Sequence, residues 1–317
     1  MTALRRLLLV EWSGLAAAIV AGACALAVIA PNFLTAFNIY VMLRSLCVGL
    51  LVAFAQMITL GVGQMNIAVG AIGGLVAIAL GGMVEVYGLP LAVAAPLALA
   101  IGALAGVVNG LLIVRTGVNA FIITLATGSA FTGVNFGVTR SIPFYKMPPA
   151  LVAFGDDHLG PMPFLLVAPL LVAALLGLFF SRTAPGRRLL AFGGNPHAAE
   201  LSGISRRRVV VSAHVLSGLL AAVAAVLAVA QLGSAQPTIG ADWLLLSFAA
   251  PIIGGAALTG GYISVLGTMF AVLLIGLIQN GMVLAKVDPY WVQFVLGALI
   301  LAAVGLNRWR AVNNGEA

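Results

Sequence analysis

Long apolar stretches, separated by short polar segments, follow one another along the whole chain. The hydrocarbon core of a bilayer is about 30 Å thick, so a helix needs about 20 apolar residues to cross it. By this measure the pattern predicts spans at 12–30, 39–60, 63–83, 89–114, 119–138, 163–181, 209–231, 243–260, 262–284 and 289–306. We therefore expect an all-α, polytopic membrane protein of about ten transmembrane helices.

The composition excludes a soluble protein. Apolar residues make up 62% of the 317 residues, charged residues make up 7%, and the mean hydropathy is +1.18. Soluble domains carry about 25% charged residues because a hydrated surface must cover their core. No long polar segment interrupts the chain, so residues 1–317 are expected to form one transmembrane domain that begins with an uncleaved helix at 12–30.

The net charge of +7 comes from basic residues that gather on one side of the predicted membrane. With the amino terminus in the cytoplasm, the internal positions hold Arg5, Arg6, Arg115, Arg182, Arg187, Arg188, Arg206, Arg207, Arg208, Arg308 and Arg310. The external positions hold Arg140, Lys146 and Lys286, and Arg44 is unassigned. The positive-inside rule thus predicts cytoplasmic termini, a cytoplasmic loop at 182–208 and a periplasmic loop at 139–162.

Two glycine-dense stretches indicate an internal repeat. They read GVGQMNIAVGAIGG at 61–74 and GGAALTGGYISVLG at 254–267, and each is followed by a span with an Asn-Gly pair. On the predicted topology the two units run in opposite directions, which is typical of an inverted repeat, here 39–138 against 209–306. Chance similarity between glycine-rich apolar segments is the alternative.

The segment 61–70 also predicts a broken helix. Gly61, Gly63, Gln64 and Asn66 crowd about one and a half helical turns. Irregular backbone at membrane depth is tolerated only where it faces protein or water. Close packing between helices explains the other glycines, at 70–82, better than a break does.

Catalytic chemistry is poorly supplied. The acidic residues all fall at span ends or in loops, which argues against a proton-coupled transporter, and the histidines show no metal-ligand spacing. A phosphate-binding loop needs Lys directly after Gly, but the two lysines follow Tyr145 and Ala285. We expect a chain that is not an enzyme and has no metal or cofactor; if ATP drives it, another chain hydrolyses the ATP.

Neutral polar residues within the spans are the candidates for a solute path. The set is Gln64, Asn66, Asn109, Thr124, Thr127, Gln279 and Asn280. Amides and hydroxyls suit a hydroxyl-rich neutral solute, but they suit hydrogen bonds between helices equally well. Gln64 and Asn66 are the strongest candidates because they lie in the predicted break.

The cytoplasmic loop 182–208 has the sequence RTAPGRRLLAFGGNPHAAELSGISRRR. Its arginines alone indicate orientation and contact with anionic lipid. Its middle predicts a short helix, because Asn195 can cap a helix that starts at Pro196 and Gly203 can end it. Such a helix below the membrane is a candidate docking element for a cytoplasmic partner. The candidate coupling residues are Gly193, Gly194, Asn195, Ala198, Glu200, Leu201 and Gly203.

Three segments resemble the ribose-type sugar permeases of ABC importers. The loop matches their Gly-Arg, Ala-x-Gly-Gly-Asn, Ala-Ala and Leu-Ser-Gly-Ile pattern, and 254–304 matches their Gly-Gly-x-x-Leu-x-Gly-Gly segment with its later Asn-Gly. The third segment is 38–74. The resemblance implies alternating access in a bacterial inner membrane. It also implies three partners: an ATP-binding subunit holding ATP and magnesium, a periplasmic solute-binding protein, and a second permease copy.

The chain departs from that family at the predicted break. The family usually reads Gly-Gly-Ile-Asp-Leu-Ser-Val-Gly, where this chain has Gln64, Asn66 and Ala68 in place of the second glycine, the aspartate and the serine. Permeases for branched-chain amino acids or nucleosides are therefore the alternative within transport. A channel or facilitator that works without ATP is the alternative from another class.

Overall fold

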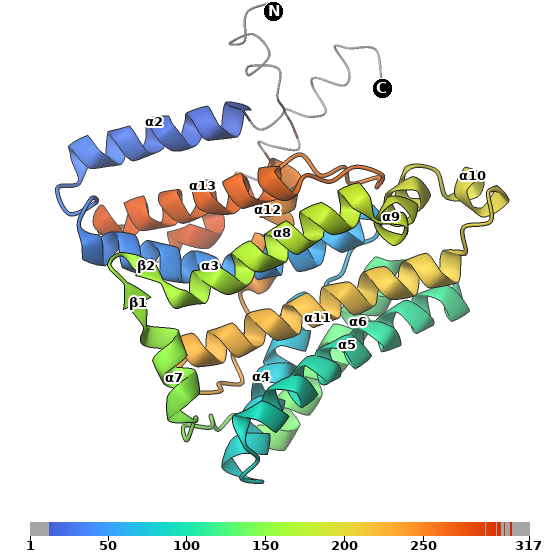
Figure 1. Ribbon diagram of the computed structural model, residues 1–317, viewed down its shortest axis with the longest axis horizontal. Helices are drawn as coiled ribbons and strands as arrows, with labels where there is room; N and C mark the ends of the chain where they lie inside the picture. The colour runs from blue at the N-terminus through green and yellow to red at the C-terminus, as the bar shows by residue number, and fades with distance from the viewer. Residues whose placement is uncertain (1–12, 289, 296, 299–300, 302–304, 306–317) are drawn as a thin grey trace, which may run out of the picture.

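The computed structural model describes residues 13–288, 290–295, 297–298, 301 and 305. Within them the chain folds into a helical bundle with one short two-stranded hairpin (Figure 1). The elements are α2 (Ser13–Ile29), α3 (Ala36–Gly61), α4 (Val69–Glu85), α5 (Leu91–Thr116), α6 (Ala120–Thr139), α7 (Pro149–Asp156), β1 (His158–Leu159), β2 (Met162–Pro163), η1 (Phe164–Leu166), α8 (Val167–Arg182), α9 (Ala184–Gly194), α10 (Pro196–Leu201), α11 (Arg206–Leu232), α12 (Trp243–Ile253) and α13 (Val265–Leu284).

The described residues include six helices that are long and apolar enough to cross a membrane. They are α3, α5, α6, α8 with η1, α11 and α13, and the shorter apolar helices are α2, α4 and α12. This confirms the prediction of an all-α, multi-pass membrane protein. It does not confirm the count of about ten, and the span predicted at 289–306 lies partly outside the described residues.

Two predicted spans are shorter as helices than their apolar sequence suggested. The span 63–83 becomes helical only at Val69, and the span 243–260 stops being helical at Ile253. Gly255, two residues after the end of α12, has φ +93°. Residues other than glycine disfavour this conformation, and the chain cannot continue as a helix through it. Hydropathy does not register this change because the glycine-rich backbone remains apolar after the helix has ended.

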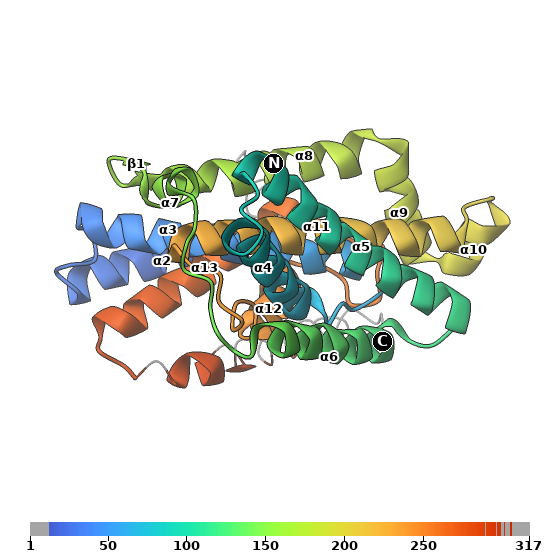
Figure 2. The same ribbon diagram turned by 90° about the horizontal axis from the view of Figure 1, so that it is seen from below.

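The packing has an exchange symmetry centred on α3 and α11. These two helices lie side by side and run in opposite directions (Figures 1 and 2). Helices α4 and α5 pack against α11 and against each other, and α12 and α13 pack in the same way against α3 and against each other. Exchanging α3, α4 and α5 with α11, α12 and α13 therefore maps one set of contacts onto the other, as expected of an inverted repeat of 39–138 and 209–306.

The repeat aligns differently from the two glycine-dense stretches of the sequence. In this exchange the counterpart of the α3–α4 connection, 62–68, is the α11–α12 connection, 233–242, whereas 254–264 lies between α12 and α13. The similarity of 61–74 and 254–267 was therefore not a repeat in register. The two stretches instead meet in space, because the N–H of Gly261 donates to the carbonyl of Gly61 (3.0 Å).

Small residues bring α5 onto the backbone of α11. A Cβ on Gly106 would lie 2.2 Å from the carbonyl oxygen of His214, and a Cβ on Gly102 would lie 2.6 Å from that of Gly218. Association of helices in a membrane relies on such close approach because lipid supplies no hydrophobic drive between them. The contact holds the two halves of the bundle together. Both ends of α11 carry accessory segments, α9 and α10 at one end and α7 with the hairpin at the other (Figure 1).

Candidate functional site

The connection between α3 and α4 is a helix break, as the sequence predicted. The chain leaves α3 at Gly61, turns at Gly63 with φ +70° and becomes helical again at Val69. A Cβ on Gly63 would lie 2.8 Å from the carbonyl oxygen of Thr259. Glycine is therefore required there both by the backbone conformation and by the neighbouring segment.

Side chains of α3, α6 and α11 form hydrogen bonds to this break, the first two to its backbone and the third to the side chain of Asn66. Gln56 of α3, in the amide orientation that satisfies its partners, donates to the carbonyl of Asn66 (2.9 Å) and accepts from its N–H (3.2 Å). Thr124 of α6 accepts from the N–H of Ile67 (3.0 Å). The Asn66 side chain donates to Ser217 of α11 (2.9 Å) and accepts from the N–H of Ala68 (3.0 Å). The break is a closed hydrogen-bonded unit, as buried backbone in a membrane requires.

Two predicted path residues thus have structural partners in this unit. Asn66 and Thr124 are fully buried and bonded within the protein. Gln64 is half-buried, and its Oε1 accepts from Nε2 of His214 at 3.0 Å. Gln64 is consequently the polar side chain of this break that retains exposed surface.

A second break at 233–242 was missed by the sequence reading, which took it for a loop between two spans. Gly233 and Gly240 both have positive φ, at +64° and +89°. The second break meets the first turn of α4, directly after the first break, backbone to backbone. A Cβ on Gly70 would lie 2.0 Å from the oxygen of Gly240, and one on Gly240 would lie 2.1 Å from the oxygen of Gly70. The glycines and Pro237 in QLGSAQPTIGAD were the available signal.

The second break is also tied to the 139–162 loop. Phe144 and Ala235 exchange two backbone hydrogen bonds (3.0 and 2.9 Å). Arg44 of α3, unassigned by the sequence, donates to the carboxylate of Asp156 (2.6 Å) and to the carbonyl of Gln231 (2.7 Å). The loop is therefore attached to the end of α11 and to the segment that follows it.

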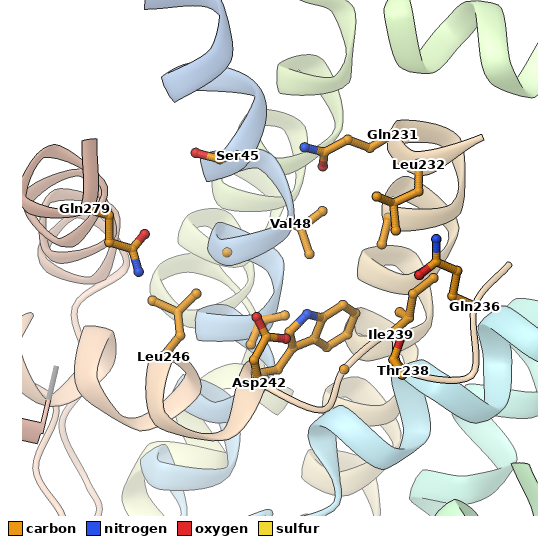
Figure 3. A pocket seen from close by; sticks show the side chains of 15 residues that line it. Ser45, Val48, Gln231, Leu232, Gln236, Thr238, Ile239, Asp242, Leu246 and Gln279 are labelled. Carbon is orange, nitrogen blue, oxygen red and sulfur yellow. The ribbon is translucent and has the colours of Figure 1, made fainter. Parts of the chain in front are cut away.

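A polar cavity of about 350 Å³ lies beside the second break, between α3, α11, α12 and α13 (Figure 3). Its polar lining comprises Ser45, Gln231, Gln236, Thr238, Asp242 and Gln279, with Trp243 and aliphatic residues completing the wall. Figure 3 shows the carboxylate of Asp242 and the amide of Gln279 reaching from different helices toward the same space. Among the described residues, no Arg, Lys or His lines this cavity. Such a lining can donate to and accept from hydroxyl groups.

The remaining predicted path residues have different surroundings in the structure. Gln279 lines the cavity, but the adjacent Asn280 exchanges two hydrogen bonds with Asn38 of α3 (3.0 and 2.9 Å) and joins α13 to α3. Thr127 donates to the carbonyl of Ile123 in its own helix (3.0 Å). Asn109 is buried, and its amide has no partner among the described residues. Asp242, at the start of an apolar helix, is the cavity residue that the candidate set lacked.

The cytoplasmic loop of the prediction contains the expected capped helix. Asn195 accepts from the N–H of Ala198 (3.0 Å) at the start of α10, and Gly203, with φ +82°, follows its end. Glu200 and Leu201 are exposed, Leu201 to 79%. Figure 1 shows α10 projecting from one end of the bundle. The exposed side of α10 is therefore not covered by any other part of the chain that the structure describes.

The two glycines before α10 contact both glycine-rich segments. A Cβ on Gly193 would lie 2.0 Å from the oxygen of Gly61 and 2.6 Å from the nitrogen of Gly261. Gly194 lies equally close to Gly261 from the other side, since a Cβ on Gly261 would be 2.6 Å from the Cα of Gly194. We call this cluster of 61–63, 193–194 and 260–261 the glycine junction. It connects the projecting α10 directly to the first break.

Paired broken helices in a polytopic bundle, with a polar cavity at one of them, define a membrane transport protein. A family model described as "Branched-chain amino acid transport system / permease component" matches residues 29–304. The chain belongs to this family of permeases.

Several relatives share most of the chain. The fructose import permease protein of Rhizobium meliloti is 31% identical over 89% of this chain and 81% of its own length. The ribose import permease protein of Bacillus subtilis is 35% identical over 88% and 87%. An autoinducer 2 import system permease protein of Photorhabdus laumondii is 35% identical over 82% and 79%. These relatives confirm the resemblance to sugar permeases. No solved structure gives a significant match.

Proposed function

We propose that this chain is the permease subunit of an ATP-driven importer and forms the path of a sugar or a sugar-like solute across a bacterial inner membrane. The observation that carries the proposal is the cavity at the second break in a chain whose relatives are named as importers of ribose and fructose. The distribution of arginines supports cytoplasmic termini, on the same side of the membrane as the loop 182–208.

The chemistry of the cavity favours a neutral, hydroxyl-rich solute over an amino acid. A free amino acid carries a carboxylate, which binding sites pair with a cationic side chain or with helix N-termini. The cavity is lined by a carboxylate, amides and hydroxyls and by no cationic residue. The ammonium of a bound amino acid would pair with Asp242, but its carboxylate would have only the N-terminus of α12 to bind and no cationic side chain among the described lining residues.

The glycine junction supports an ATP-driven mechanism in which another subunit binds ATP and magnesium. In this proposal α10 docks on that subunit, and Gly193 and Gly194 transmit its movement to the first break, which touches the second break at Gly70 and Gly240. Backbone-to-backbone contacts transmit displacement well because no flexible side chain lies between the moving parts. A second permease copy completes the path, and the 139–162 loop faces a solute-binding protein.

Uptake by the reconstituted complex tests the proposal. The permease would be placed in liposomes with its ATP-binding subunit and its solute-binding protein, and uptake of labelled ribose, fructose, leucine and adenosine would be measured with and without ATP. We expect ATP-dependent uptake of a sugar. ATP-dependent uptake of leucine or adenosine alone would transfer the chain to the amino-acid or nucleoside permeases. Equal uptake without ATP would identify a facilitator instead.

A further inference from the structure

A second polar cavity, of about 460 Å³, lies at the end of the molecule that carries α10. It is enclosed by α9, by the turn after α10 and by the first residues of α11. Arg188 of α9 and Arg208 of α11 both line it, and none of the acidic residues that the structure describes does so. Figures 1 and 2 place this region at the outer end of the long helices, where α9 and the start of α11 adjoin. The cavity has a positive lining.

The charge of these two arginines is not neutralised within the described chain. Among the described residues the ion pair is that of Arg44 with Asp156, at the opposite end of the bundle. Glu200, the acid within 182–208, does not line the cavity. Two guanidinium groups without a carboxylate can bind an oxyanion, and phosphate is the anion whose geometry arginine matches by paired hydrogen bonds.

Two of the three cavity serines already donate within the protein. Ser202 donates to the carbonyl of Ala198 (2.9 Å), and Ser212 donates to that of Val209 (3.0 Å). Ser205 accepts from the N–H of Arg208 (3.5 Å), so its hydroxyl can donate to an anion beside the two guanidinium groups, which supply the positive charge.

The depth of the cavity distinguishes a lipid from a soluble anion. In α11 the arginines 206–208 are followed directly by an apolar run, so the membrane surface is expected between Arg208 and Val209. The cavity continues past this level to Ser212, one turn deeper, and Leu189 forms part of its apolar wall. A soluble anion or an acidic protein segment would occupy the part of the cavity near the two arginines and leave the deeper part, next to Leu189 and Ser212, empty. A membrane lipid places its phosphate at the surface and its acyl chains below it.

We propose that this cavity binds the phosphate headgroup of an anionic membrane lipid between Arg188 and Arg208. The site is separate from the cavity at the second break, and it does not depend on which solute is carried.

Lipid binding to the purified full-length chain tests the proposal. Phosphatidylglycerol, phosphatidylcholine and inorganic phosphate would each be titrated while bound lipid is counted by native mass spectrometry. We expect retention of phosphatidylglycerol in preference to phosphatidylcholine. The double variant Arg188→Gln/Arg208→Gln should bind phosphatidylglycerol roughly 30-fold more weakly, since each basic residue near a membrane surface contributes about 1 kcal/mol.

The matched control is Arg115→Gln, which removes an arginine from the last turn of α5 that does not line the cavity. It should change binding by less than about 3-fold, because Arg115 does not line the cavity and can act on a bound anion only through attraction that salt screens. The melting temperature in phosphatidylcholine shows whether each variant is folded.

Equal losses of phosphatidylglycerol binding in the control and the double variant would reveal unspecific surface attraction. Displacement of the lipid by inorganic phosphate would make the site a free-anion site. Displacement by the purified ATP-binding subunit would assign the cavity to that protein. Each of these three results overturns the proposal.

Discussion

Both helix breaks leave backbone groups without helical hydrogen bonds, but they use their polar side chains differently. At the first break, 62–68, the polar groups are used within the protein: Gln56, Thr124 and Ser217 bind its backbone or the side chain of Asn66. At the second break, 233–242, polar side chains including Gln236 and Asp242 line a cavity. Under the proposed function, the first break stabilises the fold and the second break offers polar side chains to a solute. Polar residues in a membrane break are therefore not evidence of a solute site until their partners are known.

The largest expected effect comes from separating the two breaks. In Gly70→Ala the new Cβ would lie 2.0 Å from the carbonyl oxygen of Gly240, so one backbone has to move. Overpacking of this kind costs about 1–3 kcal/mol or more. We expect a clear fall in the melting temperature in detergent and loss of ATP-driven uptake. Gly137→Ala on α6, which meets nothing within 4 Å, is the control and should behave as the wild type.

The next effect concerns the first break alone. Asn66→Ala removes the partner of Ser217 and of the Ala68 N–H, and each buried group left without a partner costs about 1–3 kcal/mol. The variant should melt at a lower temperature, while its surviving fraction keeps the apparent KM for the solute. A raised KM with an unchanged melting temperature would instead make Asn66 a solute ligand and remove the distinction between the two breaks.

The converse result is expected at the second break. Asp242→Asn keeps the shape of the side chain but removes a charged acceptor, and a hydrogen bond to a charged group is worth about 1.5–3 kcal/mol. We expect a roughly 10- to 100-fold rise in the apparent KM for uptake at an almost unchanged melting temperature. Gln279→Glu changes the cavity lining from α13 instead. It should also weaken uptake without lowering the melting temperature, as expected if both side chains face the solute.

The smallest effect is expected at Thr127. Its hydroxyl bonds to the carbonyl of Ile123 in its own helix, and it takes part in neither break nor cavity. Thr127→Val should therefore leave uptake and the melting temperature within experimental error of the wild type. A specific loss of uptake in this variant would show that the path includes α6 on the side away from the cavity.

Local patterns predicted the features that depend on neighbouring residues. The apolar stretches indicated the helices, and the glycines with Gln64 and Asn66 indicated the first break. Asn195, Pro196 and Gly203 indicated α10, because caps and turns are decided within a few residues. The second break was missed because its sequence resembles an ordinary polar loop between two spans. What makes it part of the site is its contact with Gly70, which is distant in the chain.

The sequence by itself determined that this is a helical membrane protein, where one helix breaks and where a short helix projects from the bundle. Only the tertiary structure decided which polar residues are available to a solute. Asn66, Asn280 and Gln279 are similar side chains in similar apolar surroundings, yet two are bonded to other helices and one faces a cavity. The physical reason is that an amide's role depends on which helix lies opposite it, and that is decided by packing between segments far apart in sequence.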